Sequence, residues 1–419
     1  MGKTIAEKIL SAHAHKDLHA GDYAVCDVDF CFGQDGTSML IVDRIKELGV
    51  KKLFNRSKFC MVIDHNAPSP SQRVSKVHKK MTNFASEFNL SLFDIGCGIC
   101  HQVIPESGSV LPGMLVLGAD SHTCSYGALN VFSTGVGSTD LAITLASGKN
   151  WFRVPETIKI IVEGKLPKGV FAKDIILHII GDVGANGCTY KAVEFYGETV
   201  RALSVEGRLT IANMVVEMGA KAGLFESNSK TFTWLKRHGI NKQGNPQKAD
   251  KDARYEKIIK YDVSKLLPQI ARPHTVDNVV AVNRIAGKPI NQGFLGTCTN
   301  GRLEDLQVAA TLLKGRKVKP GIKFIVAPAS RKIYLDALKL GFIETFIRAG
   351  GVVLNPGCGP CVGTHEGILA DNETAISTAN RNFKGRMGNP NAFIYLASPA
   401  TVVASVIEGK ISNPQKYFK

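Results

Sequence analysis

The chain has 419 residues, of which 44% are hydrophobic and 21% are charged, and its formal net charge is +16. This length predicts two or three domains with cores of their own, because one domain usually spans roughly 100 to 200 residues. No apolar run reaches the roughly 18 residues that a membrane helix needs. The first residues lack the apolar segment of an export signal, so we expect a cytoplasmic protein.

Predicted strands and helices alternate along the chain. The segment 302–315 has apolar residues at helical spacing and stops at Gly315, which predicts a helix. Short apolar and β-branched runs predict buried strands at 59–65, 113–122, 276–283, 322–330, 350–355 and 391–399. Such alternation is typical of α/β folds with parallel sheets. We expect three domains, over residues 1–153, 154–278 and 279–419, with a surface excursion at 227–260.

Polar side chains follow several of these strands directly. Asp64 and His65 end one strand, and Asp120, Ser121 and His122 end another. In open α/β sheets the ligand crevice lies outside the carboxyl ends of the strands. These side chains are therefore expected to face one cleft, together with the cysteines that follow the strand at 350–355.

Ten cysteines without an export signal predict reduced thiols rather than a disulfide framework. Cys26, Cys60 and Cys188 are interpreted as small buried hydrophobes. Cysteines in glycine-rich and proline-rich loops are instead candidates for metal ligation. Those in such loops that stand out are Cys298, Cys358 and Cys361.

Three interpretations of this cysteine set compete. The set could hold a structural zinc with His365 as fourth ligand, an iron–sulfur cluster with one iron left open, or no metal. Cys298 precedes a predicted helix with Asn300 as its cap, and Cys361 precedes a possible helix in 362–371. A helix N-terminus favours a thiolate, which suits either metal. From the residues alone, a zinc site and an iron–sulfur cluster are about equally well supported.

The basic charge has two interpretations, nucleic-acid binding or attraction of anionic substrates. The densest basic runs are 73–80 and 314–323, and neither is interleaved with aromatic residues that could stack on bases. The sequence therefore does not predict a nucleic-acid partner.

Several motifs, taken in their order along the chain, point to one family. They are "QDGTS" (34–38), "VIDHNAPS" (62–69), "GCGICHQ" (96–102), "GADSHT" (118–123), "AVEFYG" (192–197), "GTCTNGR" (296–302), "NPGCGPCVG" (355–363) and "NRNFKGR" (380–386). With them the chain resembles the aconitase family of hydro-lyases over essentially its whole length. The resemblance implies three α/β/α domains around a cluster-containing cleft, without the swivelling fourth domain of single-chain members.

The resemblance also implies a cofactor and roles for individual residues. The cofactor would be one 4Fe–4S cluster on Cys298, Cys358 and Cys361, with one iron open to substrate. The implied catalytic carboxylate–histidine pairs are Asp64 with His65, Asp120 with His101, and Glu194 with His122. The implied substrate-binding residues are Gln34, Ser121, Arg381 and Arg386, and Asn380 would lie beside the cluster.

A partner and a substrate class follow from the same resemblance. A separate small subunit would supply the missing domain, in a heterodimer or heterotetramer, and this chain alone would be inactive. The substrate would be a small dicarboxylate or tricarboxylate. We expect 2- and 3-isopropylmalate, as in leucine synthesis, with homocitrate as the alternative. A hypothesis of another class is that the cluster-free protein binds RNA.

Overall fold

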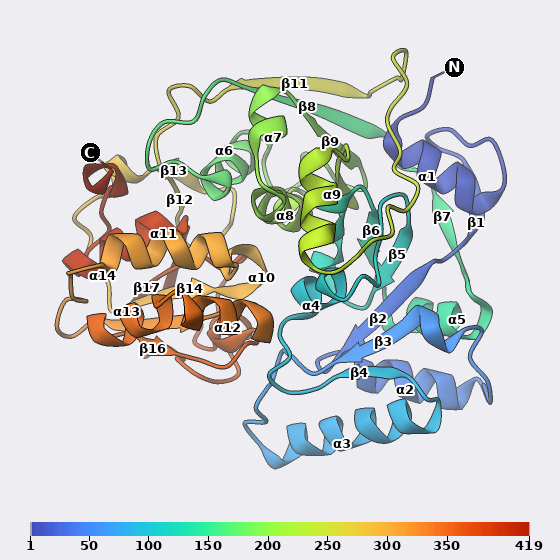
Figure 1. The fold of residues 1–419 in the computed structure, drawn as a ribbon, viewed down its shortest axis with the longest axis horizontal. Helices are drawn as coiled ribbons and strands as arrows, with labels where there is room; N and C mark the ends of the chain where they lie inside the picture. Colours follow the sequence, from blue (N-terminus) through green and yellow to red (C-terminus); the bar gives the residue numbers. More distant parts are fainter. Residues whose placement is uncertain (1, 419) are drawn as a thin grey trace.

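A computed structural model describes residues 2–418, and its strands form three sheets of four or more strands and one antiparallel pair. In Figure 1 the first sheet lies at the lower right, the third at the lower left, and the second above them. The α/β class predicted from the sequence is confirmed. The predicted domain limits stay a prediction.

The first sheet is wholly parallel and has the order β4-β3-β2-β5-β6. Its strands are β2 (Phe30–Gln34), β3 (Phe59–Val62), β4 (Ser91–Phe93), β5 (Leu115–Gly118) and β6 (Phe132–Gly135). The antiparallel pair is β1 (Tyr23–Asp27) with β7 (Lys149–Arg153). The helices of this part are α1 (Ile5–Ala14), α2 (Ser38–Glu47), η1 (Arg56–Lys58), α3 (Gln72–Glu87), α4 (Cys100–Glu106), η2 (Ser121–Leu129) and α5 (Ser138–Ser147).

The second sheet is also parallel, with the order β10-β9-β8-β11. Its strands are β8 (Thr157–Glu163), β9 (Ala192–Tyr196), β10 (Ala222–Phe225) and β11 (Lys257–Asp262). The helices are α6 (Ala172–Val183), α7 (Glu198–Ala202), α8 (Val205–Met214), η3 (Val215–Met218) and α9 (Ser229–Arg237). The exposed part of the predicted excursion lies between α9 and β11.

The third sheet has seven strands in the order β13-β12-β18-β17-β14-β15-β16, and antiparallel pairing occurs only around β12. Its strands are β12 (Gln269–Ala271), β13 (Val279–Ala281), β14 (Gln292–Gly296), β15 (Lys323–Ala327), β16 (Val352–Val353), β17 (Thr374–Ser377) and β18 (Phe393–Ala397). The helices are η4 (Val282–Arg284), α10 (Thr297–Asn300), α11 (Leu303–Leu313), α12 (Arg331–Lys339), α13 (Phe342–Ala349), η5 (Gly359–Val362), α14 (Pro399–Glu408) and η6 (Pro414–Tyr417). The predicted boundary at 279 falls inside this sheet, because β12 precedes it.

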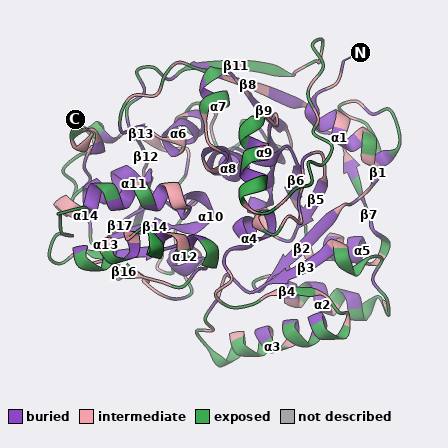
Figure 2. Cartoon of the chain, in the orientation of Figure 1, coloured by how far each residue is buried: buried purple, intermediate pink, exposed green. Residues whose placement is uncertain are grey.

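Each strand segment predicted from the sequence contains a strand, and α11 occupies the predicted helix. These strands are continuous apolar runs because helices cover both faces of a parallel sheet. Figure 2 shows buried strands and outer helices such as α3 with exposed faces. Among residues 2–418 no helix is both long and apolar enough to span a membrane.

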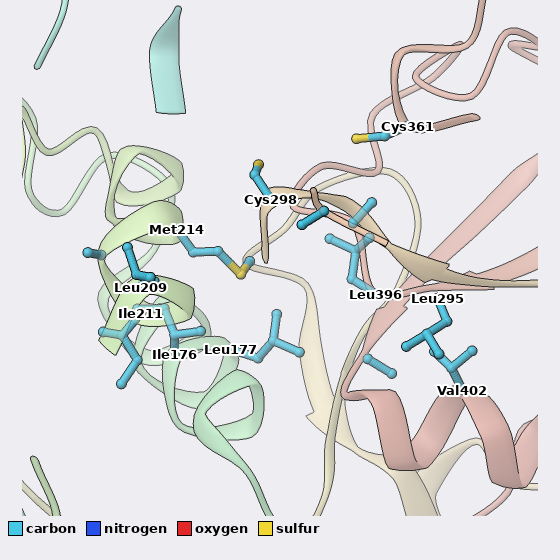
Figure 3. Packing of buried hydrophobic residues seen from close by; sticks show 14 of the residues in the cluster. Ile176, Leu177, Leu209, Ile211, Met214, Leu295, Cys298, Cys361, Leu396 and Val402 are labelled. Atoms are coloured by element: carbon cyan, nitrogen blue, oxygen red, sulfur yellow. The ribbon is translucent and has the colours of Figure 1, made fainter. Parts of the chain in front are cut away.

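The first sheet separates two hydrophobic cores. Phe59 and Met61 face the smaller core with α1 and α2, whereas Cys60 and Val62 face the larger one. This alternation follows from the period of two along a strand. The larger core continues through α6 and α8 into the third sheet, and Figure 3 shows Cys298 and Cys361 among its residues.

The contact between η2 and β10 places the turn that follows β5, and it depends on Gly127. A Cβ atom at this position would lie 1.9 Å from the carbonyl oxygen of Gly223. Gly127→Ala should therefore lower the free energy of unfolding by about 1–3 kcal/mol, as overpacking does. Urea denaturation of the metal-free protein measures this.

A matched control exists in the same part of the chain. At Gly137 the nearest atom to an added Cβ is 3.4 Å away and φ is −65°. Gly137→Ala should change the stability far less. Equal effects of the two substitutions would contradict the packing argument.

Candidate active site

A cavity of about 290 Å³ lies where the carboxyl ends of β2, β3, β5 and β14 meet. Three hollows are larger, at about 440, 550 and 650 Å³, but no cysteine is among the residues that line them, so volume alone does not identify the site. The predicted residues that line the smaller cavity are Gln34, His65, His101, Asp120, Ser121, His122, Cys298, Cys358, Cys361, Asn380, Arg381 and Arg386. Asp64 lies directly behind His65.

The His65 imidazole lies between two carboxylates. Its Nδ1 is 2.7 Å from Asp64 Oδ1 and its Nε2 is 3.3 Å from Asp120 Oδ2. Burial opposes protonation of the ring, but Cys358, Asp64 and Asp120 outweigh burial and raise the pKa of His65 well above its ordinary value. The arrangement therefore favours an imidazolium whose Nε2 faces the cavity.

Asp35 holds this turn in place, and sequence reasoning did not single it out. Its carboxylate accepts hydrogen bonds from the backbone N–H groups of Asp64, His65 and Asn66, at 2.8–2.9 Å. Burial would raise the pKa of Asp35, but His78, His65 and these donors lower it. The buried carboxylate is thus ionised and fixes the backbone that carries His65.

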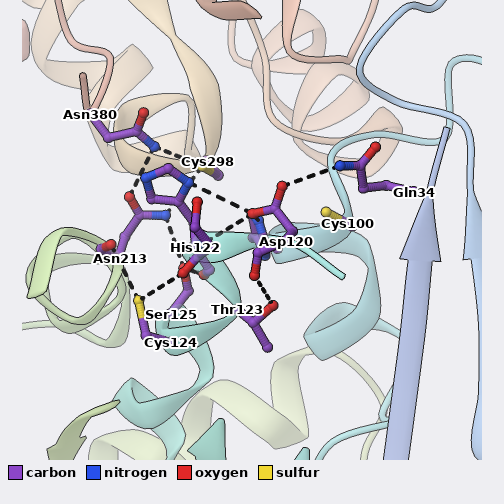
Figure 4. A network of polar contacts seen from close by, with 12 residues as sticks. Gln34, Cys100, Asp120, His122, Thr123, Cys124, Ser125, Asn213, Cys298 and Asn380 are labelled. Atoms are coloured by element: carbon purple, nitrogen blue, oxygen red, sulfur yellow. Dashed lines mark hydrogen bonds and ion pairs between the residues drawn. The ribbon is translucent and has the colours of Figure 1, made fainter. Parts of the chain in front are cut away.

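Asp120 is the carboxylate that connects the imidazoles. Its Oδ1 is 2.8 Å from His101 Nε2 and accepts from the His122 backbone N–H at 2.8 Å, while Gln34 Nε2 donates to Oδ2 at 3.3 Å. Burial would raise the pKa of Asp120, but these neighbours hold it well below its ordinary value. Figure 4 shows the network around this residue.

The predicted pairing of His122 with Glu194 is wrong. His122 Nε2 instead lies 3.1 Å from Glu217 Oε1, which also accepts from Arg381 Nε at 2.7 Å. Burial would raise the pKa of Glu217, but His122 and Arg381 lower it. The structure therefore places Glu217, on η3, in the position expected for Glu194.

Glu194 lies in the middle of β9 and contacts α1 rather than the cavity. Its carboxylate accepts hydrogen bonds from Ile5 N at 2.7 Å, Tyr196 Oη at 2.7 Å and Tyr255 Oη at 3.1 Å. It therefore caps the first turn of α1, where free N–H groups need an acceptor. Burial raises the pKa of Glu194 despite these donors.

A sequence signal for Glu217 did exist. Asn213 and Glu217 are polar residues four positions apart in the apolar segment "IANMVVEMGA". Residues spaced by four lie on one side of a helix, which marks a polar spot on a buried element. Asn213 also reaches the site, because its Nδ2 donates to Cys298 Sγ at 3.2 Å (Figure 4).

The three predicted thiols are buried, and all ten cysteines of the chain are free. Cys298 lies on α10 directly after β14, and Cys358 and Cys361 lie at η5. Burial raises the pKa of the Cys298 thiol to about 12 and also raises that of Cys358. Ionised sulfurs at these positions therefore require a metal or another source of positive charge.

Hydrogen-bond donors surround these sulfurs. Asn380 Nδ2 lies 3.5 Å from Cys298 Sγ, and Arg386 Nη2 lies 3.5 Å from Cys361 Sγ. Arg386 Nε and His101 Nδ1 are buried and have no hydrogen-bond partner among residues 2–418. Donors toward sulfur, with the unpaired N–H of Arg386 Nε beside them, fit an anionic metal–sulfur group and an anionic ligand.

The sulfurs of Cys298, Cys358 and Cys361 are not gathered as tightly as one ion requires. Among the described residues they do not form a set whose ligand atoms all lie within 4.8 Å of one another. A single zinc ion, with bonds of about 2.3 Å, would hold its sulfurs roughly 4 Å apart. The zinc interpretation also needs His365 as its fourth ligand. His365 instead contacts the His65 carbonyl oxygen and the Glu366 carboxylate.

Two local predictions around the cysteines are wrong. Asn300 does not cap α11: its amide donates to Asp305, which accepts from the Arg302 backbone N–H instead. No helix forms over 362–371, because η5 ends at Val362 and the following glycines adopt positive φ. The short 3-10 helix η5 therefore carries Cys361, and turns rather than a helix follow it.

Comparison with known proteins identifies the family. The model of the aconitase family (aconitate hydratase) matches residues 7–289 and 282–409. A 3-isopropylmalate dehydratase large subunit 2 from Archaeoglobus fulgidus is 54% identical, with 100% of both chains covered. A probable methanogen homoaconitase large subunit from Methanosarcina mazei is 48% identical, covering 94% of this chain and 100% of that protein. Aconitase X from Thermococcus kodakaraensis, a solved structure, matches with a TM-score of 0.49 and 13% identity over 91% of this chain and 93% of that one. The chain belongs to the aconitase family.

Proposed function

We propose that this chain is the large subunit of a 3-isopropylmalate dehydratase, a hydro-lyase that interconverts 2- and 3-isopropylmalate by dehydration and rehydration. One observation carries the proposal: three buried thiols and three carboxylate–imidazole contacts meet at one cavity in a member of the aconitase family. The name of the Archaeoglobus relative, at 54% identity over the whole chain, supports this substrate.

We infer that Cys298, Cys358 and Cys361 would hold one 4Fe–4S cluster. The spread of the sulfurs, the engaged His365 and the amide and guanidinium donors support a cluster over zinc. When bound, such a cluster supplies a Lewis-acidic iron with a position open to the substrate hydroxyl. A zinc protein would be colourless, whereas the cluster gives a brown protein prepared without oxygen.

His65 is suited to protonate the departing hydroxyl. Its raised pKa keeps a proton on the ring near neutral pH, and its Nε2 faces the cavity. Asp64 at Nδ1 fixes the orientation of the ring and stabilises the imidazolium. Ligand atoms of Asp64, His65 and Cys358 lie within 4.8 Å of one another, so this proton is held beside the thiol site.

The cavity also offers groups that can bind a carboxylate. Arg386 has a buried, unpaired Nε, and Arg381 and Gln34 line the same space. A guanidinium group binds a carboxylate with two parallel hydrogen bonds, which fixes the orientation of the substrate. Ser121 lines the cavity beside them and is the remaining predicted substrate contact.

A small subunit would complete the enzyme. The relatives are named as large subunits, which implies a partner for them, and we infer the same for this chain. Homocitrate is the second candidate substrate, because relatives named as homoaconitase large subunits are 47–48% identical.

One prediction concerns turnover. The chain is reconstituted without oxygen with iron, sulfide and the small subunit of the same organism, and is offered isopropylmalate, homocitrate and citrate in parallel. We expect selective turnover of isopropylmalate, and none with the large subunit alone. Selective turnover of homocitrate would move the protein to the homoaconitase branch. An intact cluster without turnover of any substrate would remove the substrate assignment.

A further prediction separates the roles of the two buried glutamates, Glu194 and Glu217. Glu217→Gln should lower kcat by roughly 10- to 100-fold while the protein stays folded, because Glu217 positions His122 and Arg381. Glu194→Gln should instead lower the free energy of unfolding by about 1–3 kcal/mol, because a buried acceptor for α1 is weakened, and leave kcat near that of the wild type.

Steady-state kinetics and urea denaturation of both variants check this pair. A folded Glu194→Gln protein with strongly reduced kcat would show that its carboxylate serves the reaction after all. Wild-type kinetics in Glu217→Gln would remove Glu217 from the site.

A further inference from the structure

Lys173 is a buried cation behind the thiol cavity that the reaction outlined above does not use. Its side chain, on the first turn of α6, has 0% of its surface exposed. Its Nζ donates to the carbonyl oxygens of Thr378 at 2.9 Å and Ala379 at 2.7 Å. Buried lysines are rare unless an anion compensates their charge.

No carboxylate forms an ion pair with Lys173 among the residues that the structure describes. The adjacent Asp174 carboxylate already accepts from the backbone N–H groups of Phe171 and Gln269. The first turn of a helix carries a partial positive charge, which makes this position still less favourable for a cation. The ammonium group is therefore short of negative charge in the metal-free protein.

The thiols are the groups that can supply this charge. Burial lowers the pKa of Lys173 to about 7, whereas Cys298 and Cys361 raise it, ahead of Asp305 and Asp174. Cysteines ligate a metal as thiolates. Loading the site thus fixes negative charge on Cys298, whose neighbour Thr299 shares the Thr378 carbonyl oxygen with the Lys173 ammonium group.

We propose that Lys173 is the built-in counter-charge of the metal–sulfur group, a positioning residue that favours the loaded site over the empty one. The inference rests on the cluster in the proposed function. A fixed positive charge near a cluster also stabilises its reduced state, so Lys173 raises the reduction potential.

The same ammonium group orders the loop that faces the sulfurs. The Thr378 carbonyl oxygen also accepts from Thr299 Oγ1 at 2.8 Å, which joins the loop to the segment that carries Cys298. Asn380 follows directly, and its amide reaches Cys298 Sγ and Asn213 Oδ1. Lys173 therefore contributes both a positive charge and a tether, which is its pair of hydrogen bonds to the loop carbonyl oxygens. The experiment must separate the effect of the charge from that of the tether.

The experiment compares Lys173→Met and Lys173→Gln with the wild type. Gln removes the charge but keeps a donor for the carbonyl oxygens. For each protein, the visible absorbance of the reconstituted cluster is followed after addition of a chelator, and its reduction potential is measured. We expect both variants to lose the cluster roughly 10- to 100-fold faster than the wild type. We also expect the reduction potential of the cluster to be lower in both variants. The metal-free Lys173→Gln protein should be at least as resistant to urea as the wild type, whereas Lys173→Met also loses the donor for the two carbonyl oxygens.

Arg208 provides the matched control. It is 1% exposed, its guanidinium contacts the carbonyl oxygens of Glu226 and Arg201, and burial alone lowers its pKa to about 10. Arg208→Met therefore removes a buried cation that no cysteine faces. We expect equal changes of stability in the loaded and the metal-free protein, and a wild-type rate of cluster loss.

Several results would overturn the proposal. Wild-type cluster retention in Lys173→Gln would show that the tether matters and the charge does not. Equal loss of stability with and without the cluster, or failure of both variants to fold, would assign Lys173 a purely structural role. A wild-type protein that takes up no cluster would overturn the proposed cofactor itself. This outcome is seen in the wild type alone, so it is distinguished from a failure of the Lys173 proposal.

Discussion

The buried Asp120 carboxylate is the contact on which the geometry of the site depends. It faces three histidines and Gln34 at the carboxyl end of β5, while its side chain is largely removed from water. Removing one partner of a buried charge typically costs about 3–5 kcal/mol, so the imidazoles cannot swing away independently. β2, α4 and η2 are thereby held in one arrangement before any substrate arrives. The His65 imidazole is positioned by folding rather than by binding.

The thiol half and the imidazole half of the site are joined by backbone contacts. Cys358 N donates to the Asp64 carbonyl oxygen at 2.9 Å, and Ile99 N donates to that of Ala329 at 2.9 Å. A Cβ atom at Gly98 would lie 2.5 Å from the same Ala329 oxygen, so only glycine permits this approach. Backbone contacts therefore join the first and third sheets directly, and they set the distance between His65 and the sulfurs.

The strand ends could be predicted from sequence because parallel strands covered on both faces are uninterrupted apolar runs that stop at polar residues, as "FCMVIDH" does. Contacts between residues far apart in the chain could not be predicted in the same way. Glu194 and Glu217 both lie in apolar surroundings, and only the packing of β9 against α1 sends the Glu194 carboxylate away from the cavity. The Asn300 cap failed for a similar reason, since Asp305 takes that place from the next turn. Local patterns identify elements, but which buried acid meets which donor is decided by packing.

Buried carboxylates and buried cations lie in different parts of the site. The Asp64 and Asp120 carboxylates, which contact imidazoles, follow strands of the first sheet, whereas buried cations that form no carboxylate ion pair within residues 2–418 lie behind the thiols. Arg302 belongs to the second group: it is 1% exposed and donates to the carbonyl oxygens of Cys298 and Thr299. With Lys173 it places positive charge on the backbone carbonyls of the segments beside Cys298 and Asn380. On the proposed function these cations would favour an anionic metal–sulfur group, and the His65 ring, which has a ligand atom within 4.8 Å of the Cys358 sulfur, would hold its proton at the same end of the cavity. The charges that folding buries would thus place the acid directly beside the group that takes the substrate hydroxyl.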